Sequence, residues 1–314
     1  MSKIIATGSY LPSNYYSNTD LITKYNIDSS HEWIQQRSGI EGRYLADTDE
    51  SVGSLAIEAS KALLAKVDSD IMAEIRFIVV ASMSSFSPTP SLANQVQAAI
   101  GATNAWTVDV NAACSGFVMA LELANQVSRN YASGYTLVIG AEKMSDILNF
   151  EDRSTAVLFG DGAGALLLKN DGEQLTDYQH YLASASDDAL SIHLEQTGDN
   201  YYLTMLGREV FNFVNRTVIS SLSDFIAEHH LSYDYLVCHQ ANQRLLDLFA
   251  KKLKISHDKI PSNIQKVANT SAGSIPILLD QMVTEQLIRL DGTQSIILSG
   301  FGGGLSWGHL YFKL

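Results

Sequence analysis

Short runs of apolar, mostly β-branched residues alternate along this chain with longer segments of helical periodicity, and this alternation constrains its fold. The runs that predict buried strands are Ile75–Ala81, Trp106–Val110, Tyr135–Ile139, Tyr235–Cys238 and Ser295–Ser299. The segments that predict helices are Val52–Lys66, Ser91–Ile100, Gly116–Arg129, Glu209–His229 and Ile275–Leu290. Such alternation favours an α/β layered fold with at least partly parallel sheets. Ser91 can cap the start of its helix, and Gly101 lies where a helix-terminating glycine is expected.

The two halves of the chain share a weak repeat. In the first half, Ala113–Gly116 opens a predicted helix, and a strand ending at Gly140 follows. In the second half, Thr270–Gly273 opens a helix, and a strand ending at Gly300 follows. Any α/β protein contains such helix starts, but a length of 314 residues also suggests about two units at ~150 residues each. Turn-forming residues at Lys169–Asp177 mark the division, which gives halves of 1–172 and 173–314.

The composition excludes several classes of protein. Acidic residues outnumber basic ones by 34 to 21, and the net charge of −13 argues against binding nucleic acid or an anionic membrane through bulk electrostatics. The apolar runs are far shorter than the ~20 residues of a membrane span, and the N-terminus lacks the apolar core of a signal peptide. With two cysteines, the chain can form neither a disulfide framework nor a zinc site built from cysteines. We therefore expect a cytoplasmic protein without membrane insertion, nucleic acid or metal.

Cys114 lies where a predicted strand turns into a helix, flanked by Ala113, Ser115 and Gly116. Small neighbours allow a tight turn that exposes one side chain, as in nucleophile elbows. A thiol at a helix N-terminus also sees the positive end of the helix dipole, which favours the thiolate. The turn therefore predicts either a nucleophile or a packed core cysteine, which is the commoner place of this residue. Cys238, which ends an apolar strand, is expected to be buried and inert.

Two polar residues of the second half are further candidates for chemistry. His239 follows the strand Tyr235–Cys238, and the carboxyl end of a buried strand is the usual place for active-site residues in α/β proteins. Asn269 comes just before the second small-residue helix start. An asparagine there is either a cap or turn residue, or a donor of its amide to a substrate oxygen.

Together these segments resemble the β-ketoacyl-acyl carrier protein synthase III family, the condensing enzymes that start bacterial fatty acid synthesis. The matching segments are Asn111–Phe117, His239–Asn242, Asn269–Pro276, Phe159–Ala165 and Gly300–Gly308. The first three carry the family's Cys-His-Asn triad, and the resemblance extends from about Ile4 to the C-terminus. It implies a homodimer with a thiolase-like fold, in which two duplicated halves form a five-layered αβαβα body.

The resemblance also implies the reaction and the partners. Cys114 would be acylated by an acyl-CoA, with acetyl as the expected acyl group. His239 and Asn269 would assist a decarboxylative condensation with malonyl-acyl carrier protein. The backbone N–H groups of Cys114 and Gly304 would form the oxyanion hole. No cofactor is expected, because the coenzyme A thioester is a substrate.

For coenzyme A, the resemblance implies an adenine clamped between Trp33 and Arg153, with Arg37 at the nucleotide phosphates. Stacking and cation–π attraction suit the first pair, and a planar guanidinium also suits phosphate. Taken without the resemblance, Trp33 is interpreted as an anchor that packs a surface helix.

A basic segment interrupts the acidic chain. Residues 240–266 contain six basic and two acidic residues, a net charge of +4. Arg244, Lys251 and Lys252 lie on the helix after His239, where the resemblance implies docking of an acidic carrier protein. A solvated helix face is the plainer interpretation of such a run, but the local reversal of sign favours docking.

Two positions depart from the family pattern. Asn212 stands where members often carry lysine, and either Arg208 or Arg216 could replace that docking residue. Thr89 lies in the loop that the resemblance places across the dimer interface, against the partner's acyl pocket, and it is smaller than the aromatic residue of some members. A roomier pocket would leave both acetyl and branched primers open.

Three other functions stay open on the sequence. A related thiolase-fold acyltransferase or a polyketide-starting synthase would keep the fold and change the acceptor. A papain-type cysteine hydrolase also has Cys, His and Asn in this order, but its cysteine signature is absent. A non-catalytic binding protein would not need the intact triad.

Overall fold

The first half of the chain forms a five-stranded sheet. The computed structural model describes residues 2–170 and 177–314, so the predicted boundary at 172/173 lies outside the described residues. The strands are β1 (Lys3–Tyr10), β4 (Ile75–Ala81), β5 (Trp106–Val110), β6 (Gly134–Glu142) and β7 (Gly162–Asn170). Their order in the sheet is β1-β7-β6-β4-β5. β4 is parallel to β5 and β6, whereas β7 is antiparallel to β6 and β1.

The second half repeats this arrangement. Its strands are β8 (Gln179–Ser184), β11 (Tyr235–Cys238), β12 (Ser295–Gly302) and β13 (Ser306–Lys313), in the order β11-β12-β13-β8. β11 is parallel to β12, and β13 is antiparallel to β12 and β8. In chain order and direction, β8, β11, β12 and β13 therefore correspond to β1, β4, β6 and β7. This correspondence confirms the predicted duplication.

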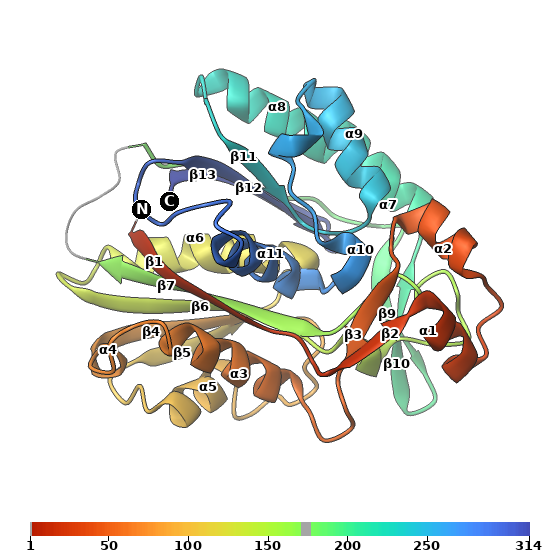
Figure 1. The fold of residues 1–314 in the computed structure, drawn as a ribbon, viewed down its shortest axis with the longest axis horizontal. Coiled ribbons are helices and arrows are strands. Elements are labelled where there is room, and N and C mark those ends of the chain that lie inside the picture. The colour runs from red at the N-terminus through yellow and green to blue at the C-terminus, as the bar shows by residue number, and fades with distance from the viewer. Residues whose placement is uncertain (1, 171–176) are drawn as a thin grey trace.

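Helices lie on both faces of each sheet (Figure 1). α6 (Gly116–Ser128) and α11 (Ser274–Thr284) fill the layer between the two sheets. The outer face of the first sheet is covered by α3 (Val52–Leu64) and α5 (Leu92–Ile100), with the short α4 (Ile71–Glu74) beside them. α8 (Ile219–Glu228) and α9 (Gln243–Leu253) cover the outer face of the second sheet. The body thus has the five αβαβα layers expected from the family resemblance.

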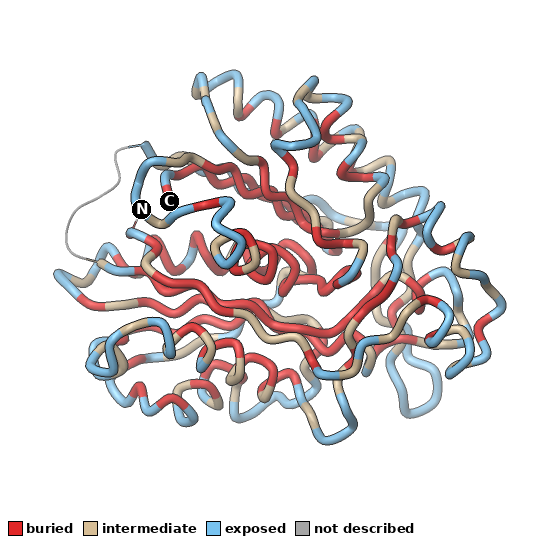
Figure 2. Tube along the Cα trace, in the orientation of Figure 1, coloured by how far each residue is buried: buried red, intermediate tan, exposed pale blue. Residues whose placement is uncertain are grey.

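The middle layer holds the main apolar core. Side chains from both central helices and both sheets pack there, among them Val79, Leu121, Leu279 and Leu298. Figure 2 shows the central helices and the strands around them as mostly buried. Gly164 allows β7 to approach α11 closely, because a Cβ there would lie 2.5 Å from the backbone nitrogen of Ile277.

The predicted helices differ from the observed ones mainly at their ends. The Ser91 hydroxyl caps α5 by accepting the N–H of Asn94 at 3.2 Å, and Gly101 ends the helix with φ 72°, as predicted. The helix predicted over residues 209–229 divides into α7 (Gly207–Phe213), the π-helical turn η3 (Val214–Val218) and α8. α7 buries no residue, whereas η3 and α8 do, so the change of geometry falls where the segment enters the core.

The remaining elements lie mainly at one end of the layers, away from the chain termini (Figure 1). They are β2 (Asn14–Ser17), α1 (Asn18–Tyr25), α2 (His31–Ser38), β3 (Gly42–Leu45), β9 (Ile192–Thr197), β10 (Asn200–Met205) and α10 (Ile264–Val267). Short turns connect the layers: η1 (Ala113–Ser115), η2 (Met144–Ile147), η4 (His257–Lys259) and η5 (Ser271–Gly273). Two of these turns, η1 and η5, begin the two central helices.

Candidate active site

Cys114, His239 and Asn269 line one cavity of about 500 Å³. Cys114 lies in η1, between the carboxyl end of β5 and the start of α6. His239 directly follows β11, and Asn269 lies just before η5. The fold therefore brings together the three residues that the sequence singled out, one from the first half and two from the second.

The turn that carries Cys114 faces its own counterpart from the second half. η1 begins with Ala113 and η5 with Ser271, and both residues have the left-handed φ of 47°. The two turns are close, because a Cβ at Gly116 would lie 3.6 Å from the Cβ of Ala272. The Ser271 hydroxyl of η5 donates to Glu142 Oε1 at 3.0 Å.

The Cys114 thiol lies in a poorly hydrated place. It is 9 % exposed, and burial raises the pKa of the thiol to about 12, although the polar side chain of Ser271 acts in the opposite direction. The negative charge of Glu142 raises this pKa further. The sequence predicted a lowered pKa from the helix N-terminus, but loss of hydration outweighs that effect here. Burial therefore favours the protonated thiol in the resting site.

The backbone around Cys114 is suited to an oxyanion. Among the described residues, the Cys114 N–H donates to no carbonyl oxygen. Gly302 lines the same cavity, and a Cβ there would lie 2.7 Å from the Cys114 nitrogen. Gly304, the predicted second donor, lies in the turn between β12 and β13 with φ 134° and lines a neighbouring cavity of about 550 Å³.

The imidazole of His239 is positioned by one hydrogen bond and by packing against one aromatic ring. It is 2 % exposed, and its Nδ1 lies 2.7 Å from the Ser274 hydroxyl. That hydroxyl also accepts the Gln240 N–H at 3.4 Å, and its own proton can be donated to Nδ1. A neutral imidazole that accepts this proton carries its own proton on Nε2. Burial lowers the pKa of His239 to about 3, so the ring is neutral at physiological pH, and the edge of Phe301 packs against it at 5.2 Å between centroids.

Asn269 is fixed so that its amide nitrogen stays available. Its Oδ1 accepts the N–H of Ser271 at 2.8 Å. Its backbone pairs with Leu158 and Gly160, through hydrogen bonds of 3.0 and 3.1 Å. The amide NH₂ is then the end of the side chain that can donate to a substrate oxygen, in the cavity that His239 also lines.

The lining of the cavity is rich in arginine. Arg153 lies 5.2 Å and Arg37 lies 5.8 Å from the centroid of the Trp33 ring, and all three residues line the cavity. Arg153 is oriented by the carbonyl oxygen of Asp28, at 2.7 Å. Trp33 is half-buried on α2, and the Arg153 guanidinium beside it also pairs with the Asp28 carboxylate at 3.5 Å. The three residues predicted to bind coenzyme A therefore lie together.

Of the docking residues predicted on α9, only one lines the cavity. Arg244, in the first turn of α9, lines the cavity, whereas Lys251 and Lys252 are exposed in the last turn. At 1.5 Å per residue, that separation is about 11 Å along the helix.

The basic residues near Asn212 are also placed differently from one another. Arg208, at the start of α7, lines the cavity, as Arg244 does. Neither Asn212 nor Arg216, both within the described part of the chain, is among the lining residues. Thr89 is exposed on the loop after β4 and does not line this cavity either.

The apolar wall of the cavity was not predicted from the sequence. It includes Met83, Met144, Phe159, Ile192, Leu203 and Met205. These side chains come from loops, η2 and the β9–β10 pair, which the interpretation of strands and helices did not cover. Two further unpredicted residues, Ser271 and Glu142, form a hydrogen bond with each other at 3.0 Å and affect the pKa of Cys114.

Residues 2–170 and 177–314 contain no group of three or more His, Cys, Asp and Glu side chains suited to a metal ion. Across the same residues, no helix is long and apolar enough to cross a membrane.

Comparisons with known proteins give one consistent picture. Residues 108–185 match the family described as "3-Oxoacyl-[acyl-carrier-protein (ACP)] synthase III", and residues 229–314 match its C-terminal domain. The β-ketoacyl-[acyl-carrier-protein] synthase III of Streptococcus equi subsp. zooepidemicus is 44 % identical over 330 aligned positions, covering 100 % of this chain and 99 % of the relative.

Solved structures agree with the sequence matches. The 3-oxoacyl-[acyl-carrier-protein] synthase III of Aquifex aeolicus superposes with a TM-score of 0.88 at 35 % identity, over 100 % of both chains. The priming β-ketosynthase of the R1128 polyketide biosynthetic pathway superposes with a TM-score of 0.91 at 31 % identity, over 100 % of this chain and 96 % of that one.

Proposed function

This chain belongs to the 3-oxoacyl-[acyl-carrier-protein] synthase III family, and we propose from that membership that it starts type II fatty acid synthesis as a condensing enzyme. It transfers an acyl group, with acetyl as the expected one, from acyl-CoA to Cys114. It then condenses this group with malonyl-acyl carrier protein and releases 3-ketoacyl-acyl carrier protein, coenzyme A and CO₂. The observation that carries the proposal is the meeting of Cys114, His239 and Asn269 in one cavity.

In the first half-reaction, the Cys114 sulfur attacks the thioester carbonyl and coenzyme A leaves. Covalent catalysis of this kind divides one difficult transfer into two easier steps. The backbone N–H of Cys114 is one proposed oxyanion donor. A second comes from the glycine turn that follows β12, with Gly304 the donor that the resemblance indicates. Loss of one such donor typically costs ~10²–10³ in rate.

In the second half-reaction, the malonyl thioester oxygen accepts hydrogen bonds from His239 Nε2–H and the Asn269 amide. Both donors are neutral and already oriented, by Ser274 and by the N–H of Ser271 respectively. Preorganised donors stabilise the charge that develops on this oxygen as CO₂ leaves. The enolate carbon then attacks the acyl group on Cys114. This scheme uses no metal and no redox cofactor.

Comparing malonyl-acyl carrier protein with malonyl-CoA as the acceptor distinguishes the proposed function from the alternative with a different acceptor. We expect the purified protein with acetyl-CoA to form acetoacetyl-acyl carrier protein from malonyl-acyl carrier protein, with one CoA and one CO₂ per product. Mass spectrometry of the carrier protein and a CoA assay measure these products. Equal or faster condensation with malonyl-CoA would contradict a carrier-protein enzyme.

We further propose a homodimer in the cytoplasm, with Thr89 at the partner's acyl pocket.

Charge reversal at Arg244 should weaken the use of the carrier protein. Arg244→Glu places a negative charge in the lining of the cavity, which an acidic partner must approach, so the KM for malonyl-acyl carrier protein should rise about tenfold and lose much of its salt dependence. The rate of Cys114 acylation by acetyl-CoA should change less than threefold, or roughly 0.6 kcal/mol. Steady-state kinetics at two salt concentrations measure both effects.

Two further variants locate the docking face. Lys252→Glu, at the far end of α9, should show a smaller change if the carrier protein covers the whole helix. Lys61→Glu, an exposed residue of α3 on the opposite outer layer, is the matched control and should show none. A response to Lys61→Glu as large as that to Arg244→Glu would mean that net charge, and not docking, controls the KM.

A further inference from the structure

The two turns that begin the central helices have the same local geometry. In η1 the Ala113 N–H donates to Asn111 Oδ1 at 3.2 Å, and in η5 the Ser271 N–H donates to Asn269 Oδ1 at 2.8 Å. Ala113 and Ser271 also share the φ of 47°. The duplication therefore sets Asn111 against Asn269 and Ala113 against Ser271. At these two pairs, the hydroxyl of Ser271 is the one chemical group that the second turn adds.

The strand ends that face the two turns differ in the same sense. The strand β12 ends at Gly302, where a Cβ would lie 2.7 Å from the Cys114 nitrogen, so glycine lets this strand approach η1. The corresponding strand β6 ends at Glu142, a completely buried carboxylate. Glu142 Oε1 reaches η5, where it accepts the Ser271 hydroxyl at 3.0 Å and the Ala272 N–H at 3.4 Å. One turn thus faces a glycine and the other faces a carboxylate.

Glu142 also binds the loop that follows β4. Its oxygens accept the hydroxyls of Ser82 and Ser84 and the N–H groups of Met83 and Ser84, at up to 3.2 Å. Among the described residues no Lys, Arg or His forms an ion pair with it. Burial raises the pKa of this carboxyl, whereas its hydrogen bonds favour the ionised form. Because every one of these neighbours donates, the site suits an acceptor with two oxygens.

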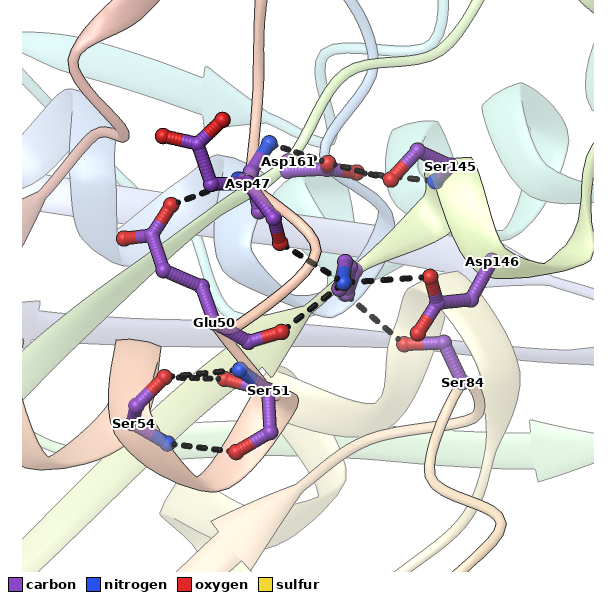
Figure 3. Close-up of polar contacts among 10 residues, drawn as sticks. Asp47, Glu50, Ser51, Ser54, Ser84, Ser145, Asp146 and Asp161 are labelled. Atoms are coloured by element: carbon purple, nitrogen blue, oxygen red, sulfur yellow. Dashed lines mark hydrogen bonds and ion pairs between the residues drawn. The ribbon is translucent and has the colours of Figure 1, made fainter.

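The end of β6 is itself firmly held. The Lys143 ammonium, next in sequence to Glu142, binds the carbonyl oxygens of Asp47 and Glu50 at 3.1 and 2.8 Å (Figure 3). The Lys143 backbone N–H donates to the Ser84 hydroxyl at 3.0 Å, and that hydroxyl in turn donates to Glu142. Glu142 is therefore a fixed support for the turn that it contacts.

Ser271 connects this support to Asn269. Its hydroxyl donates to Glu142, while its backbone N–H donates to Asn269 Oδ1. A side-chain amide carries its acceptor oxygen and its NH₂ group on opposite sides of one planar group. Holding the oxygen of Asn269 on the turn therefore also sets the direction of the NH₂ group, in the cavity that Asn269 lines.

We propose that Glu142 is a positioning residue for the second half-reaction: through the Ser271 hydroxyl it holds η5 so that the Asn269 amide points at the malonyl thioester oxygen. This role rests on the proposed function, in which Asn269 donates to that oxygen. A glutamine cannot replace the carboxylate, because its NH₂ group would face a donor at whichever end it occupied. Acylation should depend on Glu142 much less, because within the described residues no hydrogen bond joins it to the η1 turn of Cys114.

Ser271→Ala tests this role by removing the hydroxyl and keeping the backbone N–H. Alanine suits the turn, since Ala113 adopts the same φ in η1. We expect decarboxylation of malonyl-acyl carrier protein to fall about tenfold and acylation of Cys114 by acetyl-CoA to change less than about threefold. Glu142→Gln should also impair decarboxylation more than acylation. Release of labelled CO₂ and the mass of the acyl-enzyme measure the two steps.

A double-mutant cycle identifies the residue through which Ser271 acts. In Asn269→Ala the amide is absent, so adding Ser271→Ala should lower decarboxylation by less than about twofold more. A full further loss in the double variant, or equal losses of both half-reactions in Ser271→Ala, would overturn the proposed role. Glu122→Gln is the matched control and should keep the ratio of the two half-reactions. Glu122 is also a buried carboxylate, but it bonds Tyr178 and Gln126 and does not line the cavity.

Crystal structures of the wild type and of Ser271→Ala give a readout that needs no turnover. The Asn269 oxygen should move beyond about 3.5 Å from the nitrogen of residue 271, or the amide should occupy two conformers. An unchanged, singly ordered amide would contradict the role of the hydroxyl. If Glu142→Gln does not fold, Ser271→Ala decides alone. A wild-type protein that releases no CO₂ from malonyl-acyl carrier protein would contradict the proposed function, whereas the two structures would still decide whether the hydroxyl positions Asn269.

Discussion

Cys114→Ser is expected to lower the rate of acylation by acyl-CoA by roughly 10⁴-fold or more, in line with removal of a nucleophile in other covalent enzymes. A serine hydroxyl is much less acidic than a thiol, and this site already disfavours the anion through burial. Without the acyl-enzyme, condensation with malonyl-acyl carrier protein should stop as well. Intact-protein mass spectrometry after incubation with acetyl-CoA measures the adduct directly.

The second cysteine provides the control for this experiment. Cys238 is completely buried in β11, and burial raises the pKa of its thiol too, but it lines no part of the cavity. Cys238→Ala should therefore retain acylation within a few-fold while losing some thermal stability. Condensation at the wild-type rate by Cys114→Ser would refute the role of Cys114, whatever the behaviour of the control.

The parallel strands were predictable from their apolar runs, and β4 and β11 are mostly buried, whereas the edge strand β5 is not. β4, β5 and β11 match the predicted ranges, since such strands appear in a sequence as nearly continuous apolar runs. The antiparallel strands β1, β7, β8 and β13 were missed. β7 begins Gly-Ala-Gly-Ala and β8 is largely exposed, so neither shows the pattern of a buried strand. Their positions follow from pairing with distant strands, which composition does not report.

In the candidate site, too, some features were predictable from the sequence and others were not. Cys114, His239 and Asn269 are each marked by a local pattern, a strand end or a helix start, and the family resemblance joined them. The contact between Ser271 and Glu142 joins residues 129 positions apart and leaves no local signal. The pKa of Cys114 was predicted with the wrong direction, because its largest cause is burial in the folded molecule.

His239→Ala and Asn269→Ala are expected to impair the second half-reaction far more than the first. Each removes one neutral donor to the malonyl thioester oxygen, and loss of such a donor costs ~10²–10³ in rate. Acylation of Cys114 should change less than about tenfold, because neither side chain is assigned to that step. Release of labelled CO₂ from malonyl-acyl carrier protein measures decarboxylation, and the mass of the acyl-enzyme measures acylation.

The pH dependence of decarboxylation tests the protonation state of His239. Since burial lowers the pKa of His239 to about 3, its ring stays neutral above that pH, and the rate of decarboxylation should be flat between pH 5 and 8. His309 is the matched control, because burial also lowers its pKa to about 3 but its ring bonds only Ser221 and Ser299 within the described residues. His309→Gln should leave the ratio of the two half-reactions unchanged. An inflection near pH 6.5 that disappears in His239→Ala would show that His239 titrates, and an equal loss of both half-reactions in Asn269→Ala would contradict the division of roles.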